Sequence, residues 1–377
     1  METPAQSSIL AHFSLIEDPR RNHWNTLHRL YDILTIALCA VLGGADGWDD
    51  IADFGRSKHA FFTDKLKLEH GLPSSDTFRR VIASINPECF AACFLSWIEA
   101  AVGQLGGDFV GIDGKTLRGS YEKDDPKAAI HMVSAWAHAN RMILGQYKVE
   151  NKTNEITAIP KLLEMLDLKG CLATIDAMGC QGEIAQQIHE QGADYILALK
   201  GNQGTLHGDV KTFFAEAKAR NFKAREVSFS ETVNLGHARK EVRRCWVCDD
   251  VRWLDGFPKW AGLASMALIE YTRDVYSDGP TEQRYYISSR SLEAEAMIEA
   301  VRSHWGIENK VHWVLDVSFG EDASRIRRDH GAENFSVMRR VAVNLLRQDE
   351  TSKRKSIKGR RKQAGWDNDY LQRLLGF

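Results

Sequence analysis

Two aspartates end short apolar segments that alternate like β-strands. Asp113 follows Phe109-Val-Gly-Ile, and Asp176 follows Cys171-Leu-Ala-Thr-Ile. Because alternate residues of a strand face opposite sides, each carboxylate terminates a half-buried apolar run. A buried carboxylate is costly unless a cation or hydrogen-bond donors compensate its charge. One such aspartate would most simply cap the next turn, whereas the repeated arrangement favours a shared cationic ligand.

A third carboxylate, Glu308, lies in residues 301–316, whose apolar spacing predicts a helix. It is in line with an apolar stripe, because it recurs at helical intervals with Val301, Trp305 and His312. Two aspartates and a glutamate form an all-oxygen ligand set that suits Mg²⁺ or Mn²⁺. A pair of such ions activates the attacking oxygen and stabilises the leaving oxygen in phosphodiester chemistry. The pattern therefore predicts a DNA or RNA substrate.

Several longer blocks of the chain are distinctive. They are Gly111-Ile-Asp-Gly-Lys-Thr-Leu-Arg-Gly119, Lys152-Thr-Asn-Glu-Ile-Thr157, Thr174-Ile-Asp-Ala-Met178, Leu199-Lys-Gly-Asn-Gln203, His304-Trp-Gly-Ile-Glu-Asn309, His312-Trp-Val-Leu-Asp316 and Phe319-Gly-Glu-Asp322. In this order they resemble the transposases of the H-repeat-associated insertion-sequence group, within the DDE transposases that have an RNase H-like core. The resemblance covers about residues 13–346. Carried over residue by residue, it implies that the catalytic metal ligands are Asp113, Asp176 and Glu308.

The chain departs from related insertion-sequence transposases around the glutamate. Those proteins carry the pattern Y-x-x-R-x-x-x-E-x6-K, and the corresponding positions here are Val301, His304, Glu308 and Leu315. Candidate substitutes for the missing basic residues are His304, Arg302 and Lys310. On chemistry alone, the third ligand could also be Asp316, Glu321 or Asp322. The helical position and the family pattern favour Glu308.

The composition is that of an ordinary folded protein with two or three domains. The 377 residues are 44% apolar and 27% charged, with 49 Lys and Arg against 51 Asp and Glu, so the net charge gives no general attraction to nucleic acid. Basic residues are concentrated locally, with seven among residues 353–362 and a smaller cluster of Arg325, Arg327 and Arg328. Such clusters can neutralise DNA phosphates. For residues 353–362, a solvated mobile end is an equally good explanation.

The cysteines and the apolar runs predict a cytoplasmic protein with no membrane partner. Seven scattered cysteines are typical of reduced thiols. Cys245 and Cys248 form a single CxxC, for which a zinc site is the weaker alternative to two strand positions. The N-terminus lacks a basic start followed by an apolar block, and the longest apolar run, residues 33–45, is too short to cross a bilayer.

The N-terminal hundred residues are predicted to be mainly helical. Residues 27–42 have the pattern of a buried helix ended by Gly43-Gly44, and residues 48–62 form a second candidate. Residues 73–83 begin with capping Ser and Asp and could present Thr77, Arg79 and Arg80 to a DNA groove. An ordinary capped surface helix explains that segment at least as well.

From residue 106 the pattern changes to strands. We predict strands at 109–113, 129–137, 142–149, 171–176 and 195–199, with helices at 157–166, begun by Thr157, and at 181–190. This order is expected of an RNase H-like fold. The resemblance implies that the first and fourth strands are adjacent, which would bring Asp113 and Asp176 to one edge of the sheet.

We therefore predict an α/β fold in which helices flank an RNase H-like mixed sheet. A helical, DNA-binding N-terminal domain would occupy residues 1–100, and the catalytic core residues 101–222 and 291–348. A β-rich insertion would occupy residues 223–290, with strands at 225–230, 238–247, 262–271 and 283–289, and a basic tail residues 349–377. The insertion's cations, which include Arg239, Lys240, Arg243 and Arg244, would face DNA or solvent.

Candidate DNA contacts are spread over the chain. They are Arg79, Arg80, Lys115, Arg118, Lys200, Asn202, Gln203, Arg302, His304 and Lys310. For residues 200–203, an ordinary polar loop after a strand is the simpler explanation. The tryptophans and histidines of residues 304–313 could stack on a displaced base, although tryptophans more commonly pack against a sheet.

Together these features predict a DNA transposase that uses two Mg²⁺ or Mn²⁺ ions. Water would cut a strand at the element end, and the freed 3′-OH would attack target DNA, in a dimer or larger complex on double-stranded DNA. One alternative is a transposase-derived DNA-binding protein that no longer cuts, which the presence of all three acids disfavours. Another is a metal-dependent nuclease on the same core, which would cut without terminal repeats.

Overall fold

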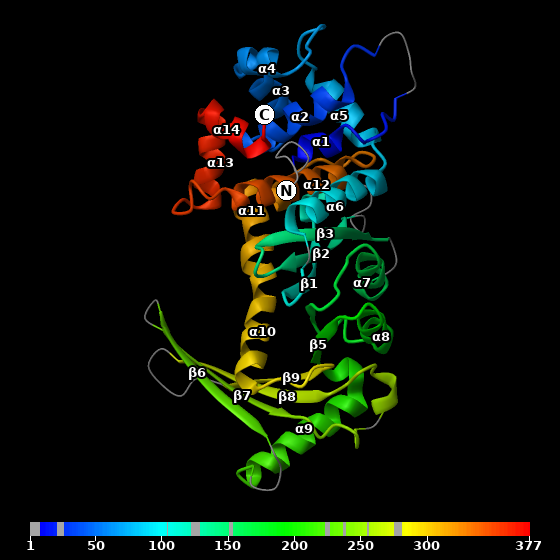
Figure 1. Ribbon diagram of the computed structural model, residues 1–377, viewed down its shortest axis with the longest axis vertical. Coiled ribbons are helices and arrows are strands. Elements are labelled where there is room, and N and C mark those ends of the chain that lie inside the picture. Colours follow the sequence, from blue (N-terminus) through cyan, green and yellow to red (C-terminus); the bar gives the residue numbers. More distant parts are fainter. Residues whose placement is uncertain are drawn as a thin grey trace.

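The computed structural model describes residues 8–20, 26–103, 105–121, 129–150, 154–222, 227–236, 239–254, 256–274 and 281–377. Lys152 and Thr153 of one family motif lie outside these ranges, as do residues 225, 226 and 238 of the predicted insertion strands. The molecule is elongated, with helices gathered at one end, a sheet core in the middle and the long strands of the insertion at the other end (Figure 1).

Five strands form the core of the sheet. They are β1 (Phe109–Thr116), β2 (His131–Ala137), β3 (Met142–Val149), β4 (Leu172–Ile175) and β5 (Asp194–Leu199). Strands β1, β2 and β3 form an antiparallel meander, while β4 pairs parallel with β1 and with β5. This is the mixed sheet of an RNase H-like fold, and the predicted fold class is therefore confirmed.

The insertion extends the same sheet. Its strands are β6 (Ser228–Gly236), β7 (Arg239–Cys248), β8 (Ser265–Asp274) and β9 (Thr281–Ser288). Strand β9 pairs antiparallel with β5, with Ile287 opposite Leu197. Within the described residues, nine strands thus form one sheet in the order β3-β2-β1-β4-β5-β9-β8-β7-β6. Helix α9 (Gly204–Ala219) packs on the insertion half (Figure 1).

The two cysteines of the CxxC segment lie on β7 and are buried with free thiols. Cys245 belongs to one apolar cluster and Cys248 to another. Residues three apart on a strand face opposite sides of the sheet, so these two thiols cannot share a zinc ion. The weaker alternative of a zinc site is excluded.

Helices cover both faces of the core sheet. Helices α7 (Glu155–Glu164) and α8 (Gly182–Glu190) pack on one face, and α10 (Ala294–Gly306) crosses the other (Figure 1). The prediction that Thr157 begins a helix was wrong. The side chain of Asn154 accepts a hydrogen bond from the Ile156 amide and begins α7. The Thr157 hydroxyl lies inside the helix and donates to the Asn154 carbonyl.

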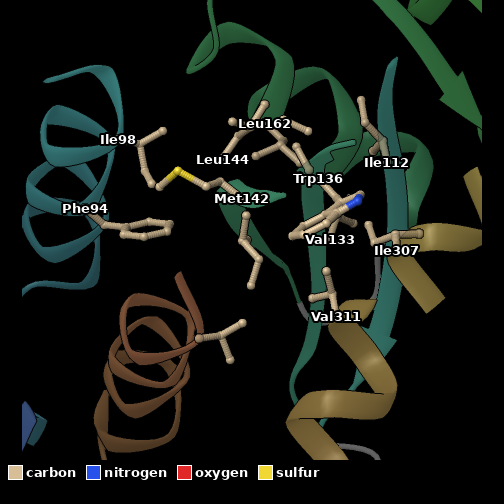
Figure 2. Close-up of a cluster of buried hydrophobic side chains, with 14 of the residues drawn as sticks. Phe94, Ile98, Ile112, Val133, Trp136, Met142, Leu144, Leu162, Ile307 and Val311 are labelled. Carbon is tan, nitrogen blue, oxygen red and sulfur yellow. The ribbon is translucent and has the colours of Figure 1, made fainter. Parts of the chain in front are cut away.

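The main apolar core joins the helical end of the molecule to the sheet. Figure 2 shows Phe94 of α6 (Pro87–Val102) and Met142 of β3 on one side, and Trp136 of β2 near Ile307 and Val311 on the other. All five side chains are almost completely buried. Ile307 and Val311 flank Glu308 in sequence, so the core anchors the segment that carries this carboxylate.

The helical end combines both termini of the described chain. It contains α1 (Ile9–Phe13), α2 (Leu30–Gly43), α3 (Trp48–Ser57), α4 (His59–Lys65), α5 (Ser75–Ser84), α12 (Gly331–Gln348), α13 (Ile357–Trp366) and α14 (Asn368–Leu375). Helix α2 is buried and ends at Gly44, whose φ of 118° suits glycine. The predicted single helix at 48–62 is divided in two, because Lys58 leaves helical geometry between α3 and α4.

None of the described helices is by itself long and apolar enough to span a membrane, although two bent pairs of helices reach that length and composition together.

The basic segment at 353–362 is helical from Ile357, where α13 (Ile357–Trp366) begins, and it is partly buried. Arg361 of α13 donates to the carbonyls of Val41 and Ala45 at the end of α2, and Arg360 donates to the carbonyl of Leu346 near the end of α12. The last carbonyls of a helix lack partners within it, and these guanidinium groups donate to carbonyls near two helix ends, of which that of Val41 also accepts from the Gly44 amide. The explanation as a solvated mobile end is therefore wrong for Arg360 and Arg361.

Candidate metal centre

The sheet places the two aspartates next to each other. In the parallel pairing of β1 and β4, Ile112 lies opposite Ile175. The residue after each isoleucine is an aspartate, Asp113 and Asp176 respectively. Asp176 also caps the turn after β4, because its Oδ1 accepts hydrogen bonds from the Met178 and Gly179 amides at 3.0 and 3.3 Å. The turn-capping and ligand explanations are thus compatible at Asp176.

Glu308 lies in a π-helical part of the predicted helix. Residues Ile307–His312 form a π-helical segment between α10 and α11 (Trp313–Phe319). The predicted helix at 301–316 is therefore present, but its middle is π-helical, and the residues expected to form one apolar stripe with Glu308 differ in burial. Trp305 is 46% exposed and the Glu308 side chain 56% exposed, while His312 is buried. The wider π turn changes which side chains share a face, and such segments are frequent at functional sites.

The carboxylates of Asp113 and Glu308 meet at His312. The His312 Nδ1 atom is 3.0 Å from Glu308 Oε2 and 3.5 Å from Asp113 Oδ2. One ligand atom from each residue lies within 4.8 Å of the others, a spacing that could hold a metal ion. His312 was not among the residues predicted to bind a metal. Its position four residues after Glu308 was the available signal.

This cluster of Asp113, Asp176 and Glu308, hereafter the cleft cluster, carries uncompensated negative charge. Burial raises the pKa of Asp113 to about 7, and the nearby charges of Asp176, Glu155 and Glu308 act in the same direction. Within the described part of the chain, no lysine or arginine forms an ion pair with either aspartate. Hard carboxylate oxygens with no internal cation fit a divalent ion.

Burial also favours the neutral form of the two histidines beside the cluster. It lowers the pKa of His312, although Glu308 opposes this effect, and it lowers the pKa of His304. His304 Nδ1 lies 3.1 Å from the Thr174 hydroxyl and 3.2 Å from the Thr174 carbonyl. His304 therefore joins α10 to β4 beside Asp176, at the position that the family pattern gives to arginine.

A cleft of about 660 Å³ opens beside the cluster. The cleft cluster and His304 line one side, and β9 with the start of α9 lines the other. Its further polar and aromatic lining includes Lys200, His207, Lys211, Arg284 and Trp305. The Arg284 guanidinium lies 5.0 Å from the centre of the exposed Trp305 ring. The cleft is large enough for a nucleotide and combines cations with an aromatic surface.

Two of the predicted DNA contacts near the cleft connect loops within the protein. The Asn202 side-chain amide donates to the Ala177 carbonyl at 2.6 Å, and that of Gln203 donates to the Cys180 carbonyl at 2.8 Å. These bonds tie the loop after β5 to the turn that holds Asp176. Lys200, in the same loop, is exposed and lines the cleft.

Lys115 is buried away from solvent rather than presented to a ligand. Its Nζ lies 2.7 Å from Asp316 and from Asp322, and 3.7 Å from Glu321. The three acids that chemistry alone allowed as third ligands thus compensate Lys115. Arg118 is highly exposed and lies 3.6 Å from Asp322.

The remaining predicted contacts lie outside the cleft. Arg302 is exposed on α10, and Lys310 is half-buried near Arg141 and Arg347. Arg79 and Arg80 are both paired with Asp76 on α5, at the helical end of the molecule (Figure 1).

Comparison with known proteins identifies the class. The family described as Transposase DDE domain matches residues 105–345, and the family described as DDE_Tnp_1-associated matches residues 10–98. The chain therefore belongs to the Transposase DDE domain family, which confirms the family inferred from the sequence motifs.

Particular relatives cover nearly the whole chain. It is 40% identical over 372 residues to "H repeat-associated putative transposase YhhI" of Escherichia coli (strain K12), with 97% of each chain covered. It is 41% identical to "Putative transposase YncI" of Escherichia coli O157:H7, covering 98% of this chain and 94% of that protein. A solved piggyBac transposase synaptic complex with hairpin DNA matches with a TM-score of 0.44 and 11% identity, covering 98% of this chain and 76% of that one.

Proposed function

We propose that this protein is an active DNA transposase that cuts DNA at the ends of an insertion sequence and joins the freed 3′-OH to target DNA. The observation that carries the proposal is the cleft cluster: Asp113 and Glu308 meet beside a nucleotide-sized cleft, next to Asp176, without an internal cation. Family membership supports the same activity.

In this proposal Asp113, Asp176 and Glu308 hold two divalent ions, Mg²⁺ or Mn²⁺. When bound, such ions polarise the phosphate and assist both the attacking and the leaving oxygen. The rigid strand ends orient the two aspartates, and the buried Ile307 and Val311 hold the Glu308 backbone against the core. The reaction breaks one P–O bond and forms another, so it requires no covalent intermediate with the protein.

Exposed cations would guide DNA into the cleft. Lys200, Lys211 and Arg284 line it opposite the cleft cluster and would contact phosphates of the cut strand. Arg79 and Arg80 on α5 and Arg302 on α10 would contact DNA farther from the site, as would the exposed cations of residues 353–362. Because both element ends must be cut, we propose that a dimer or larger assembly acts on double-stranded DNA.

The test is cleavage of a DNA fragment that carries the element's terminal inverted repeats. Purified protein with Mg²⁺ should nick at the repeat and transfer the 3′ end to a second DNA. Asp113→Asn, Asp176→Asn and Glu308→Gln should each reduce cleavage by at least about 10²-fold, because each weakens charge stabilisation worth several kcal/mol.

Glu295→Gln is the matched control, since Glu295 is an exposed acid on α10 outside the cleft lining. It should cut like the unchanged protein. Undiminished cleavage by Asp113→Asn and Glu308→Gln would refute the metal assignment. Cleavage that does not depend on the terminal repeats would indicate a nuclease. Binding of the repeat DNA without cleavage would indicate an inactive DNA-binding protein.

A further inference from the structure

His312 is oriented by the carboxylates of the cleft cluster. The ring is 4% exposed, and its Nδ1 atom is directed at Glu308 Oε2 and Asp113 Oδ2. Its Nε2 atom is buried without a hydrogen-bond partner among the residues described. The polar contacts that fix the ring are therefore those at Nδ1, where a nitrogen lies among metal-binding oxygens.

The spacing of these atoms is that of neighbouring ligands around one ion. Octahedral ligands at about 2.1 Å from a metal are separated from each other by about 3 Å. The distances from Nδ1 are 3.0 Å to Glu308 and 3.5 Å to Asp113. A small adjustment of the Glu308 side chain, which is 56% exposed, would place all three atoms around one cation.

We propose that His312 Nδ1 is a direct ligand of one divalent ion, together with Asp113 and Glu308. The inference rests on the proposed function and changes its metal chemistry. Imidazole nitrogen suits transition metals, whereas Mg²⁺ prefers oxygen donors. One of the two ions therefore has a mixed nitrogen and oxygen ligand set, and this position selects Mn²⁺ over Mg²⁺.

The test is pulsed electron paramagnetic resonance of the full chain loaded with Mn²⁺, without DNA. A ¹⁴N coupling of imidazole type should appear and should be replaced by a ¹⁵N coupling when the protein contains ¹⁵N-labelled histidine. The coupling should be lost in His312→Asn and retained in His304→Asn and His207→Asn, which change two histidines that line the cleft. The Mn²⁺ affinity of His312→Asn should fall by roughly tenfold or more, and the Mg²⁺ affinity by less.

If His312→Asn does not fold, retention of the coupling in both control variants still supports His312 by elimination. Bound Mn²⁺ without a histidine nitrogen coupling would overturn the proposal and leave His312 as a positioning residue for Glu308, with the carboxylate site of the proposed function intact. Loss of the coupling in His304→Asn or His207→Asn would also overturn it. Failure of the protein to bind Mn²⁺ at all would overturn this proposal and the proposed function together.

Discussion

Two acidic clusters lie close together in this protein, and they differ in whether lysine or arginine side chains pair with them. The cleft cluster pairs with no lysine or arginine among the described residues, whereas an internal acid cluster of Asp316, Glu321 and Asp322 is paired with Lys115 and Arg340. Strand β1 contributes to both, because Asp113 and Lys115 are two residues apart and share a face of the strand. Since the fold neutralises one cluster internally, the charge left at the other indicates where an external cation is needed.

The pKa shifts of the two clusters express the same difference. Burial raises the pKa of Asp113 to about 7. Burial would also raise the pKa of Glu321, but the charges of Arg340, Arg339 and Lys115 outweigh it and lower the pKa. Both carboxylates are largely withdrawn from water, so the neighbouring cations, and not burial alone, decide which one ionises readily.

The largest expected effect comes from breaking the internal cluster. Arg340→Met removes the closest cation of Glu321, and both side chains are completely buried. Because Lys115, at 3.7 Å, is then the nearest cation that forms an ion pair with Glu321, the free energy of unfolding should fall by about 3 kcal/mol, measured by urea unfolding. The double variant Arg340→Met with Glu321→Gln should recover part of this loss.

Arg118→Met is the control for that experiment. Arg118 pairs with the same cluster through Asp322, but its side chain is 83% exposed, so the loss should be below about 1 kcal/mol. Equal losses in Arg340→Met and Arg118→Met would show that burial does not set the importance of these pairs.

A somewhat smaller change in the free energy of unfolding is expected for Asp113→Asn in the presence of EDTA, and it is a gain in stability instead of a loss. The pKa of Asp113 rises from 3.8 to about 7 on folding, so the folded protein holds a proton in this window that the unfolded chain releases. The contribution of Asp113 to stability therefore falls as pH rises through the window, by on the order of 4 kcal/mol in all and by about 2.7 kcal/mol between pH 5 and pH 7.

Urea unfolding at pH 5 and pH 8 measures this contribution. Asp113→Asn should become more stable relative to the unchanged protein as the pH rises, and the difference should level off above about pH 7. A stability difference that is the same at both pH values would contradict the raised pKa of Asp113 in the folded protein.

Divalent ions should stabilise the protein through the cleft cluster and not through the internal one. At a concentration of 100 times Kd, Mn²⁺ should add about 2.7 kcal/mol to the free energy of unfolding. Differential scanning fluorimetry should show a rise in Tm that Asp113→Asn and Glu308→Gln abolish and Asp322→Asn retains. If only Asp322→Asn abolished the Tm rise, the ion would bind at the internal acid cluster, and the proposed metal site would be wrong.

The smallest effect on stability is expected at the exposed arginines of α5. Arg79→Ala with Arg80→Ala removes two surface pairs with Asp76, and Tm should stay within experimental error. DNA affinity should weaken similarly for all sequences, with the salt slope reduced by about 2. Unchanged affinity and salt slope would remove α5 from the proposed DNA surface.

Much of the core could be predicted because its signals are local. The predicted strand at 142–149 coincides with β3, since a short apolar run that follows a turn is a local signal of a buried strand. The helix cap at Asn154 and the break at Lys58 were missed, because neighbouring residues can also cap or continue a helix. The π-helical segment at Glu308 has no simple periodicity, and the regular helical pattern concealed it.

By itself, the sequence determined the family and the order of the strands along the chain, because these depend on residue types and their spacing. Only the tertiary structure decided which charges are compensated. Lys115, two residues from Asp113, pairs with acids some two hundred positions away, and Arg361 donates to carbonyls at and just after the end of α2 instead of facing solvent. Charge interactions and desolvation depend on distances through space, which packing sets and sequence separation does not.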